Sequence, residues 1–193
     1  MHFLLLAHGR SIEAMRALGM KNLGCVFNME YAQAADDGEA ALKAAKLYDG
    51  YYNRFFLSGV FRGEYPEEVL EGLAPHMPKG WQNDFGTIGA PLDWCGINYY
   101  TRKIIASAAG PWPSHQEVEG PLPKTAMGWE IYPAGLEFFL RRTHEDYARG
   151  LPIYVTENGL ASPRSTRWRC MASWIWSNVG ISRCPTRAST RSA

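Results

Sequence analysis

The stretch that most constrains the fold is residues 151–159, which read Leu-Pro-Ile-Tyr-Val-Thr-Glu-Asn-Gly. Its centre, residues 153–155, favours a strand, and Pro152 is tolerated at the first position of one. The run is apolar with almost no alternation, which predicts a parallel strand buried on both faces. Glu157 is therefore expected at the carboxyl end of this strand, where barrels and open α/β sheets place their chemistry. A glutamate there can be a nucleophile, a general base or a metal ligand, or it can simply cap the next turn.

Two more apolar segments alternate with helical patterns along the chain. Residues 23–28 and 92–100 are predicted to be short buried strands. The alternation predicts an α/β fold with parallel strands joined by right-handed crossovers. Residues 106–126 are predicted to be an irregular loop, whose length favours a functional loop over a linker. Helices are predicted in four stretches: residues 1–18, 40–59, a short one from Pro66, and 133–150.

Charge divides the chain into two parts. The formal net charge of +1 gives no reason to expect nucleic acid or an acidic membrane as a partner. All 19 acidic residues lie at or before Glu157, whereas residues 161–193 hold six Arg, no Lys and no acid. Helical and strand periodicity also stops at about Ser162. We therefore expect one α/β domain over residues 1–160 and an irregular Arg/Ser/Trp-rich tail over residues 161–193.

The four cysteines, Cys25, Cys95, Cys170 and Cys184, form no C-x-x-C motif and no Cys/His pair with zinc spacing. A metal site is therefore not expected, and the sequence gives no sign of an organic cofactor. Scattered cysteines in a chain of 193 residues do not indicate a disulfide scaffold, so a reducing, cytoplasmic location is predicted. The apolar start, residues 1–7, lacks the basic region and the length of a signal peptide, and no segment approaches transmembrane length.

Polar and aromatic residues follow the predicted strands at one end of the sheet. Asn98 and Tyr100 close the second strand, Trp129 lies in a later loop, and Glu157 closes the third strand. An amide, a phenol, an indole and a carboxylate at one edge suit a sugar site, because aromatic faces stack on sugar rings while polar groups bind hydroxyls. The alternative is structural: Asn98 and Tyr100 could satisfy buried backbone groups, and Trp129 could be part of the core.

Five motifs in this order resemble glycoside hydrolase family 1, the retaining β-glucosidases and β-galactosidases, over about residues 1–160. Each motif is weak alone, but together and at these distances they are highly specific. The resemblance implies a (β/α)8 barrel with its site at the carboxyl ends of the strands, of which this chain matches the stretch from the fourth helix to the seventh strand. The motifs are Leu-Leu-Ala-His-Gly at 5–9, Gly-Glu-Tyr-Pro at 63–66, Gly-Ile-Asn-Tyr-Tyr-Thr at 96–101, Thr-Ala-Met-Gly-Trp-Glu-Ile at 125–131 and Tyr-Val-Thr-Glu-Asn-Gly at 154–159.

The resemblance also implies roles for four side chains. Glu157 matches the catalytic nucleophile, and Tyr100 matches a tyrosine that hydrogen-bonds and orients its carboxylate. Asn98 resembles a polar residue beside the nucleophile, and Trp129 lines the aglycone side of the cleft. The implied reaction is double displacement on a β-linked glycoside or oligosaccharide, in which a second carboxylate about 5–5.5 Å away acts first as acid and then as base.

The chain departs from the family pattern where that second carboxylate should be. The acid/base glutamate of the fourth strand has no counterpart, and only Glu30 and Glu130 lie near the expected face; neither is favoured as a substitute. The second hypothesis is thus a catalytically incomplete fragment that binds sugar weakly at most, and the third, with little support, is an unrelated α/β binding module. The start within a helix and the abrupt change after Leu160 suggest a truncated start and a frame shift. Three strands cannot close a barrel, so self-association through exposed sheet edges is expected.

Overall fold

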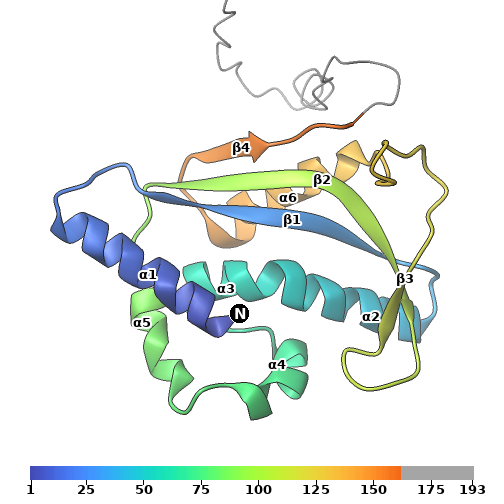
Figure 1. Cartoon of the computed structure of the whole chain (residues 1–193), viewed down its shortest axis with the longest axis horizontal. Helices are drawn as coiled ribbons and strands as arrows, with labels where there is room; N and C mark the ends of the chain where they lie inside the picture. Colours follow the sequence, from blue (N-terminus) through green and yellow to red (C-terminus); the bar gives the residue numbers. More distant parts are fainter. Residues whose placement is uncertain (162–193) are drawn as a thin grey trace, which may run out of the picture.

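A computed structural model describes residues 1–161, and the predicted tail from residue 162 onward lies outside this range. A four-stranded sheet runs through the molecule with β2 (Trp94–Ser107) at its centre. β1 (Gly24–Ala34) and β4 (Ile153–Glu157) pair with β2 in parallel, one on each side, as Figure 1 shows. The predicted α/β fold with three parallel strands is thereby confirmed.

The fourth strand was not predicted. β3 (His115–Val118) pairs antiparallel with the last residues of β2, Ile104 to Ser107, so residues 106–126 are only partly irregular. β2 continues past its expected end because Ile105 is fully buried against Ala44 and Tyr48 of the neighbouring helix. The burial of Ile105, which follows the polar residues at 98–101, thus keeps β2 extended beyond them.

The second predicted helix is longer than expected. It runs from α2 (Glu39–Asp49) through to α3 (Phe55–Arg62) and ends at Gly63, whose φ of +66° is the left-handed conformation common at helix C-termini. The prediction that Gly59 stops it is wrong. A Cβ at Gly59 would lie 2.9 Å from a side-chain carbon of Leu5, so glycine here permits close packing.

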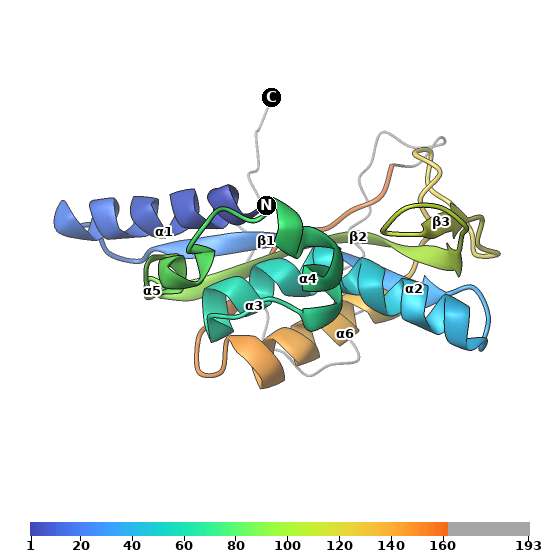
Figure 2. The same ribbon diagram turned by 90° about the horizontal axis from the view of Figure 1, so that it is seen from below.

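Within residues 1–161, helices cover one face of the sheet and leave the other open. Figure 2 shows α2, α3 and α6 (Pro133–Arg142) on the same side of the strands. The core between these layers consists mainly of Phe27, Met29, Phe55, Leu57, Ile97, Tyr99, Leu136 and Phe139. The other helical elements are α1 (His2–Ala17), α4 (Glu67–Leu73), α5 (Phe85–Ile88), π-helical turns at Gly50–Arg54 and Thr143–Tyr147, and 3-10 turns at Ala74–His76 and Trp81–Asp84. No helix in this part of the chain is long and apolar enough to cross a membrane.

The expectation that β4 is buried on both faces is wrong. Tyr154 is 54% exposed and Val155 is 37% exposed, because among residues 1–161 β4 pairs with β2 alone. In β1, by contrast, exposed and buried side chains alternate, since Val26 is exposed and Phe27 is buried. The open face and the two outer edges agree with the predicted exposure of a partial sheet.

A half-buried carboxylate ties two of the covering helices together. Asp49, at the end of α2, accepts hydrogen bonds from Arg142 of α6 at 2.8 and 3.0 Å and from Arg54 at 2.6 Å. Asn53 donates a further bond at 2.9 Å. Burial raises the pKa of Asp49, but the hydrogen bonds and charge of Arg142 outweigh it, so its pKa lies below the usual range. The ionised carboxylate thus fixes α6, and with it the loop that precedes α6.

Candidate functional site

A β-bulge at the end of β4 sets the direction of Glu157. The pairing runs Ile97 with Val155, and the next pair is Asn98 with Glu157, so Thr156 is an extra residue. Successive side chains of a regular strand point to opposite faces, whereas a bulge re-aims the residue that follows it. Thr156 and Glu157 consequently both contact groups on the open face, Asn98 and Tyr100 respectively.

The structure brings Glu157 and Tyr100 into direct contact. The Tyr100 hydroxyl donates a hydrogen bond to Oε2 of the Glu157 carboxylate. This bond is the main reason why the pKa of Tyr100 is raised, since a phenol that donates to a carboxylate resists deprotonation. Glu157 itself is exposed on the open face, so its other oxygen is accessible to a ligand. Glu157 is thus a carboxylate held in a fixed direction by the hydroxyl of an uncharged tyrosine.

Two side chains that sequence reasoning missed flank this carboxylate. The Thr156 hydroxyl donates to Oδ1 of Asn98 at 2.6 Å, which holds the amide beside Glu157. Asn158 donates from Nδ2 to the backbone carbonyl of Tyr99 at 2.7 Å and fastens the end of β4 to β2. The sequence did carry a signal for them, because polar residues flank the glutamate on both sides. The continuation of a buried strand would be apolar at some of these positions.

A tight loop presents Trp129 to the same face. The side-chain oxygen of Thr125 accepts hydrogen bonds from the backbone N–H groups of Met127 at 3.2 Å and Trp129 at 3.3 Å. Gly128 has a φ of +75°, which an L side chain would strain. The indole of Trp129 is 37% exposed and its ring centroid lies 5.6 Å from that of Tyr100. Trp129 is therefore a half-open aromatic surface and not a core residue.

The residue after Trp129 anchors this loop. Glu130 is 5% exposed and accepts hydrogen bonds from Nε of Arg102 and from the backbone N–H of Leu122, both at 2.6 Å. Burial raises its pKa, but these two bonds outweigh burial and lower it overall. Arg102 also donates to Gln33 at 2.5 Å. Glu130 is thus an ionised structural partner of Arg102.

Glu30 is likewise engaged away from Glu157. Its carboxylate accepts a hydrogen bond from Tyr48 of α2, at 2.5 Å. Burial raises the pKa of Glu30 above its usual value. Asn53 binds both backbone groups of Glu30, so this segment of β1 is held against the helical layer.

A cavity of about 360 Å³ adjoins Trp129. Its charged side chains occur as ion pairs: Arg102 with Glu130, Lys103 with Glu117 at 2.7 Å, and Lys124 with Glu119. Balanced charge with an aromatic mouth suits a neutral, hydroxyl-bearing group better than an anion. Within residues 1–161 there is no cluster of three or more His, Cys, Asp or Glu side chains that could hold a metal.

An exposed carboxylate at the carboxyl end of a parallel strand, held by a tyrosine that lies near a half-exposed tryptophan, is the kind of site that binds carbohydrate. The chain belongs to Glycosyl hydrolase family 1, whose family model matches residues 1–168. This confirms the resemblance seen in the five sequence motifs.

Several named relatives are similar to this chain. It is 41% identical over 166 residues to a beta-glucosidase from Agrobacterium sp. (strain ATCC 21400), a match that covers 82% of this chain and 36% of the relative. It is 35% identical over 162 residues to beta-glucosidase A from Thermotoga maritima, covering 83% and 36%. The solved family 1 β-glucosidase from Thermotoga maritima superposes with a TM-score of 0.76 at 34% identity over 83% of this chain and 36% of that one. The chain therefore spans little more than a third of the length of these relatives.

Proposed function

We propose that this chain carries the nucleophile side of a retaining β-glycosidase site within a partial (β/α)8 barrel. Glu157 attacks the anomeric carbon of a β-linked glycoside, the bond from that carbon to the leaving oxygen breaks, and a glycosyl ester forms on the carboxylate. Water then cleaves this ester, which releases the sugar and restores Glu157. The observation that carries the proposal is the Tyr100–Glu157 hydrogen bond on the open face beside Trp129, in a chain whose named relatives are β-glucosidases.

The neighbouring residues have supporting roles in this proposal. Tyr100 orients the nucleophile by donating a hydrogen bond to its carboxylate. Asn98 lies beside it through Thr156 and offers an amide to a sugar hydroxyl. Trp129 and the charge-balanced cavity next to it receive the aglycone, or the next sugar of an oligosaccharide. Solved relatives from Thermotoga maritima in complex with glucoimidazole and with deoxynojirimycin support a sugar ligand.

The second candidate function, a site incomplete for proton transfer, rests on the state of the two other carboxylates. Glu130 is buried and its pKa is lowered, the opposite of what a general acid requires. The pKa of Glu30 is raised, as an acid requires, but its carboxylate accepts a hydrogen bond from Tyr48 and its strand β1 is separated from β4 by β2. Neither is free to protonate a leaving oxygen. Without general acid catalysis, which is worth about 10²–10⁴-fold, only substrates whose leaving group needs no proton should react at a useful rate.

This reasoning selects the test. A 2-deoxy-2-fluoro-β-glucoside with a dinitrophenolate leaving group needs no proton donor, and its fluorine slows hydrolysis of the ester. We expect a covalent glycosyl adduct on Glu157 by peptide mass spectrometry, none in Glu157→Gln, and slower labelling in Tyr100→Phe. Glu137→Gln, which changes an exposed carboxylate on α6, is the matched control and should label normally. An adduct on another carboxylate, or undiminished labelling of Glu157→Gln, would refute the assignment.

A further inference from the structure

The carboxylate of Glu130 lies at the centre of the loop that presents Trp129, residues 120–130. Its Oε1 accepts a hydrogen bond from the backbone N–H of Leu122 at 2.6 Å. A Cβ at Gly120 would lie 2.3 Å from the same oxygen, so the glycine leaves room for the carboxylate. The first residues of the loop therefore fold around the side chain of its last residue, and Trp129 directly precedes that residue.

Consecutive residues of β2 hold both this loop and the nucleophile. Tyr100 donates a hydrogen bond to the carboxylate of Glu157. The next residue, Thr101, donates from its hydroxyl to the backbone carbonyl of Glu130 at 2.9 Å. Arg102 then donates from Nε to the Glu130 carboxylate at 2.6 Å, and both Thr101 and Arg102 are buried. One short segment of β2 thus fixes Glu157 and the loop relative to each other.

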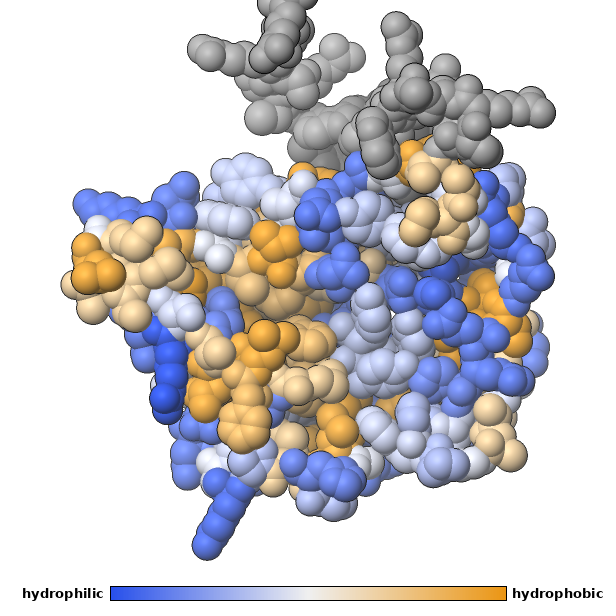
Figure 3. Space-filling model, viewed as in Figure 1, coloured by the Kyte–Doolittle hydropathy of each residue, from blue (hydrophilic) through white to orange (hydrophobic). Residues whose placement is uncertain are grey.

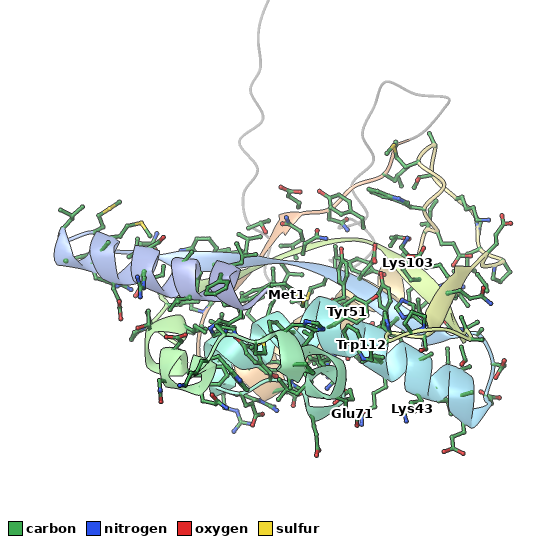
Figure 4. The ribbon with its side chains drawn as sticks, turned by 60° about the horizontal axis from the view of Figure 1, so that its bottom comes forward. Met1, Lys43, Tyr51, Glu71, Lys103 and Trp112 are labelled. Carbon is green, nitrogen blue, oxygen red and sulfur yellow. The ribbon has the colours of Figure 1, made fainter. Side chains whose placement is uncertain are left out.

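Arg102 is itself fixed by groups outside the loop. Its Nη1 donates to the side-chain oxygen of Gln33 in β1 at 2.5 Å, and its guanidinium carbon lies 4.6 Å from the centre of the Tyr132 ring. The next residue of β2 is Lys103, which is labelled in Figure 4 and pairs with Glu117 of β3 at 2.7 Å. Arg102 therefore ties the loop to the sheet, whereas Lys103 ties β3 to it.

Trp129 depends on this anchoring because its indole is only partly buried. The side chain is 37% exposed, and its ring is tilted by 51° to that of Tyr100, with 5.6 Å between the two centroids. Its backbone carbonyl accepts a hydrogen bond from the N–H of Thr125 at 2.8 Å, within the same loop. Figure 3 shows mainly hydrophilic side chains on the side of the molecule where β3 lies, in contrast to the hydrophobic side chains near α1. The place of the indole is therefore set by the backbone of the loop, which Glu130 anchors, and not by a hydrophobic cluster around it.

We propose that Glu130 is a positioning residue that sets which leaving groups this site accepts. Held by Arg102, it places the indole of Trp129 beside Tyr100. A flat leaving group can then stack on the indole while the anomeric carbon faces Glu157. Both carboxylate oxygens of Glu130 are engaged by protein groups, so it acts through Trp129 and not by binding the substrate. The inference rests on the proposed function and adds to it a residue whose loss should weaken the binding of aromatic leaving groups more than that of small ones.

The first measurement follows Trp129 by fluorine NMR of the full chain labelled with 5-fluorotryptophan, and the loss of one signal in Trp129→Phe assigns its resonance. Glu130→Gln should displace this resonance more than that of any other tryptophan. Glu137→Gln changes an exposed carboxylate of α6 and is the matched control, which should leave the resonance in place. If Glu130→Gln does not fold, Thr101→Val takes its place in both measurements, because it removes the bond to the backbone carbonyl of Glu130 and should displace the same resonance.

The second measurement compares two reagents that deliver the same 2-deoxy-2-fluoro-β-glucosyl group to Glu157. One has dinitrophenolate as its leaving group, which can stack on the indole, and the other has fluoride, which is too small to reach it. In Glu130→Gln the ratio of the half-saturating concentrations, dinitrophenyl over fluoride, should rise about three- to tenfold, as expected for the loss of one aromatic stacking contact. A general loss of folded protein would slow both reactions and leave this ratio unchanged.

The outcomes separate the two proposals. A Trp129 resonance that stays in place, or a ratio that stays at the wild-type value, would overturn the positioning role of Glu130. If neither reagent labels Glu157 in the wild type, the proposed function is wrong. The role in recognising leaving groups then fails with it, even where the fluorine resonance shows that Glu130 places Trp129.

Discussion

Neutralising Glu130 tests whether its ion pair with Arg102 stabilises the loop that presents Trp129. In Glu130→Gln the Arg102 side chain, only 7% exposed, loses its charged partner. Removing one partner of a buried pair costs about 3–5 kcal/mol. The amide retains one acceptor, and one hydrogen bond restores about 1 kcal/mol. We therefore expect a loss of about 2–4 kcal/mol in the free energy of unfolding at pH 7.

The assay is urea unfolding followed by tryptophan fluorescence. With a slope of about 1–3 kcal/mol per molar urea, the midpoint should fall by roughly 1–2 M. Glu137→Gln is the control, because its 3.5 Å pair with Arg141 is exposed and should be worth less than about 0.5 kcal/mol. A shift in Glu130→Gln no larger than in this control would refute the reasoning.

The difference in the free energy of unfolding between the wild type and Glu130→Gln should depend on pH, and it should decrease as the pH falls. The pKa of Glu130 is lowered in the folded protein, so its stabilising contribution is complete above the unfolded value of about 4.3 and is lost as pH falls through the folded value. The gap between the wild type and Glu130→Gln should narrow progressively below about pH 4. If the difference in stability between the two proteins stays constant down to pH 3, the charge of Glu130 is not its cause.

Three further outcomes are expected. Asp49→Asn should cost about 2–4 kcal/mol in urea unfolding, because the mostly buried Arg142 loses its charged partner while the amide retains one acceptor; an unchanged midpoint would contradict this. Tyr99→Phe should cost about 1–3 kcal/mol, since the backbone carbonyl that the hydroxyl now binds at 2.8 Å is left unpaired; a stabilised variant would show that this bond contributes nothing. Burial raises the pKa of Cys25 to about 11 and of Cys95 to about 12, so both should resist iodoacetamide at pH 8 in mapped peptides until the chain unfolds; rapid native labelling would contradict that burial.

The sequence predicted the order of the elements because each has a strong local signal. The apolar runs around Ile97 and Ile153 mark strands, and the amphipathic pattern after Pro133 marks α6. Local pattern could not show that β4 lies at an edge, since burial depends on what packs against a strand and not on its own residues. Local pattern also predicted wrongly that Gly59 ends a helix, because the reason for glycine there is its close contact with Leu5, which is distant in the sequence.

The candidate site was predictable in its residues but not in its geometry. Glu157, Tyr100 and Trp129 were identified from their places after strands and in a loop, and the structure brings them together on one face. The Arg102–Glu130 pair could not be foreseen, because its partners are 28 residues apart and belong to a strand and a loop.

The extra residue in β4 has a consequence for how this chain tolerates change. Because Thr156 is the extra residue, its removal would restore regular pairing and leave the glutamate opposite Asn98, on the open face. What would be lost is the hydroxyl that holds the Asn98 amide. The bulge therefore determines how many polar side chains reach the open face at the end of β4, and not whether the glutamate does. Loss of Thr156 should free the Asn98 amide while Glu157 keeps its direction.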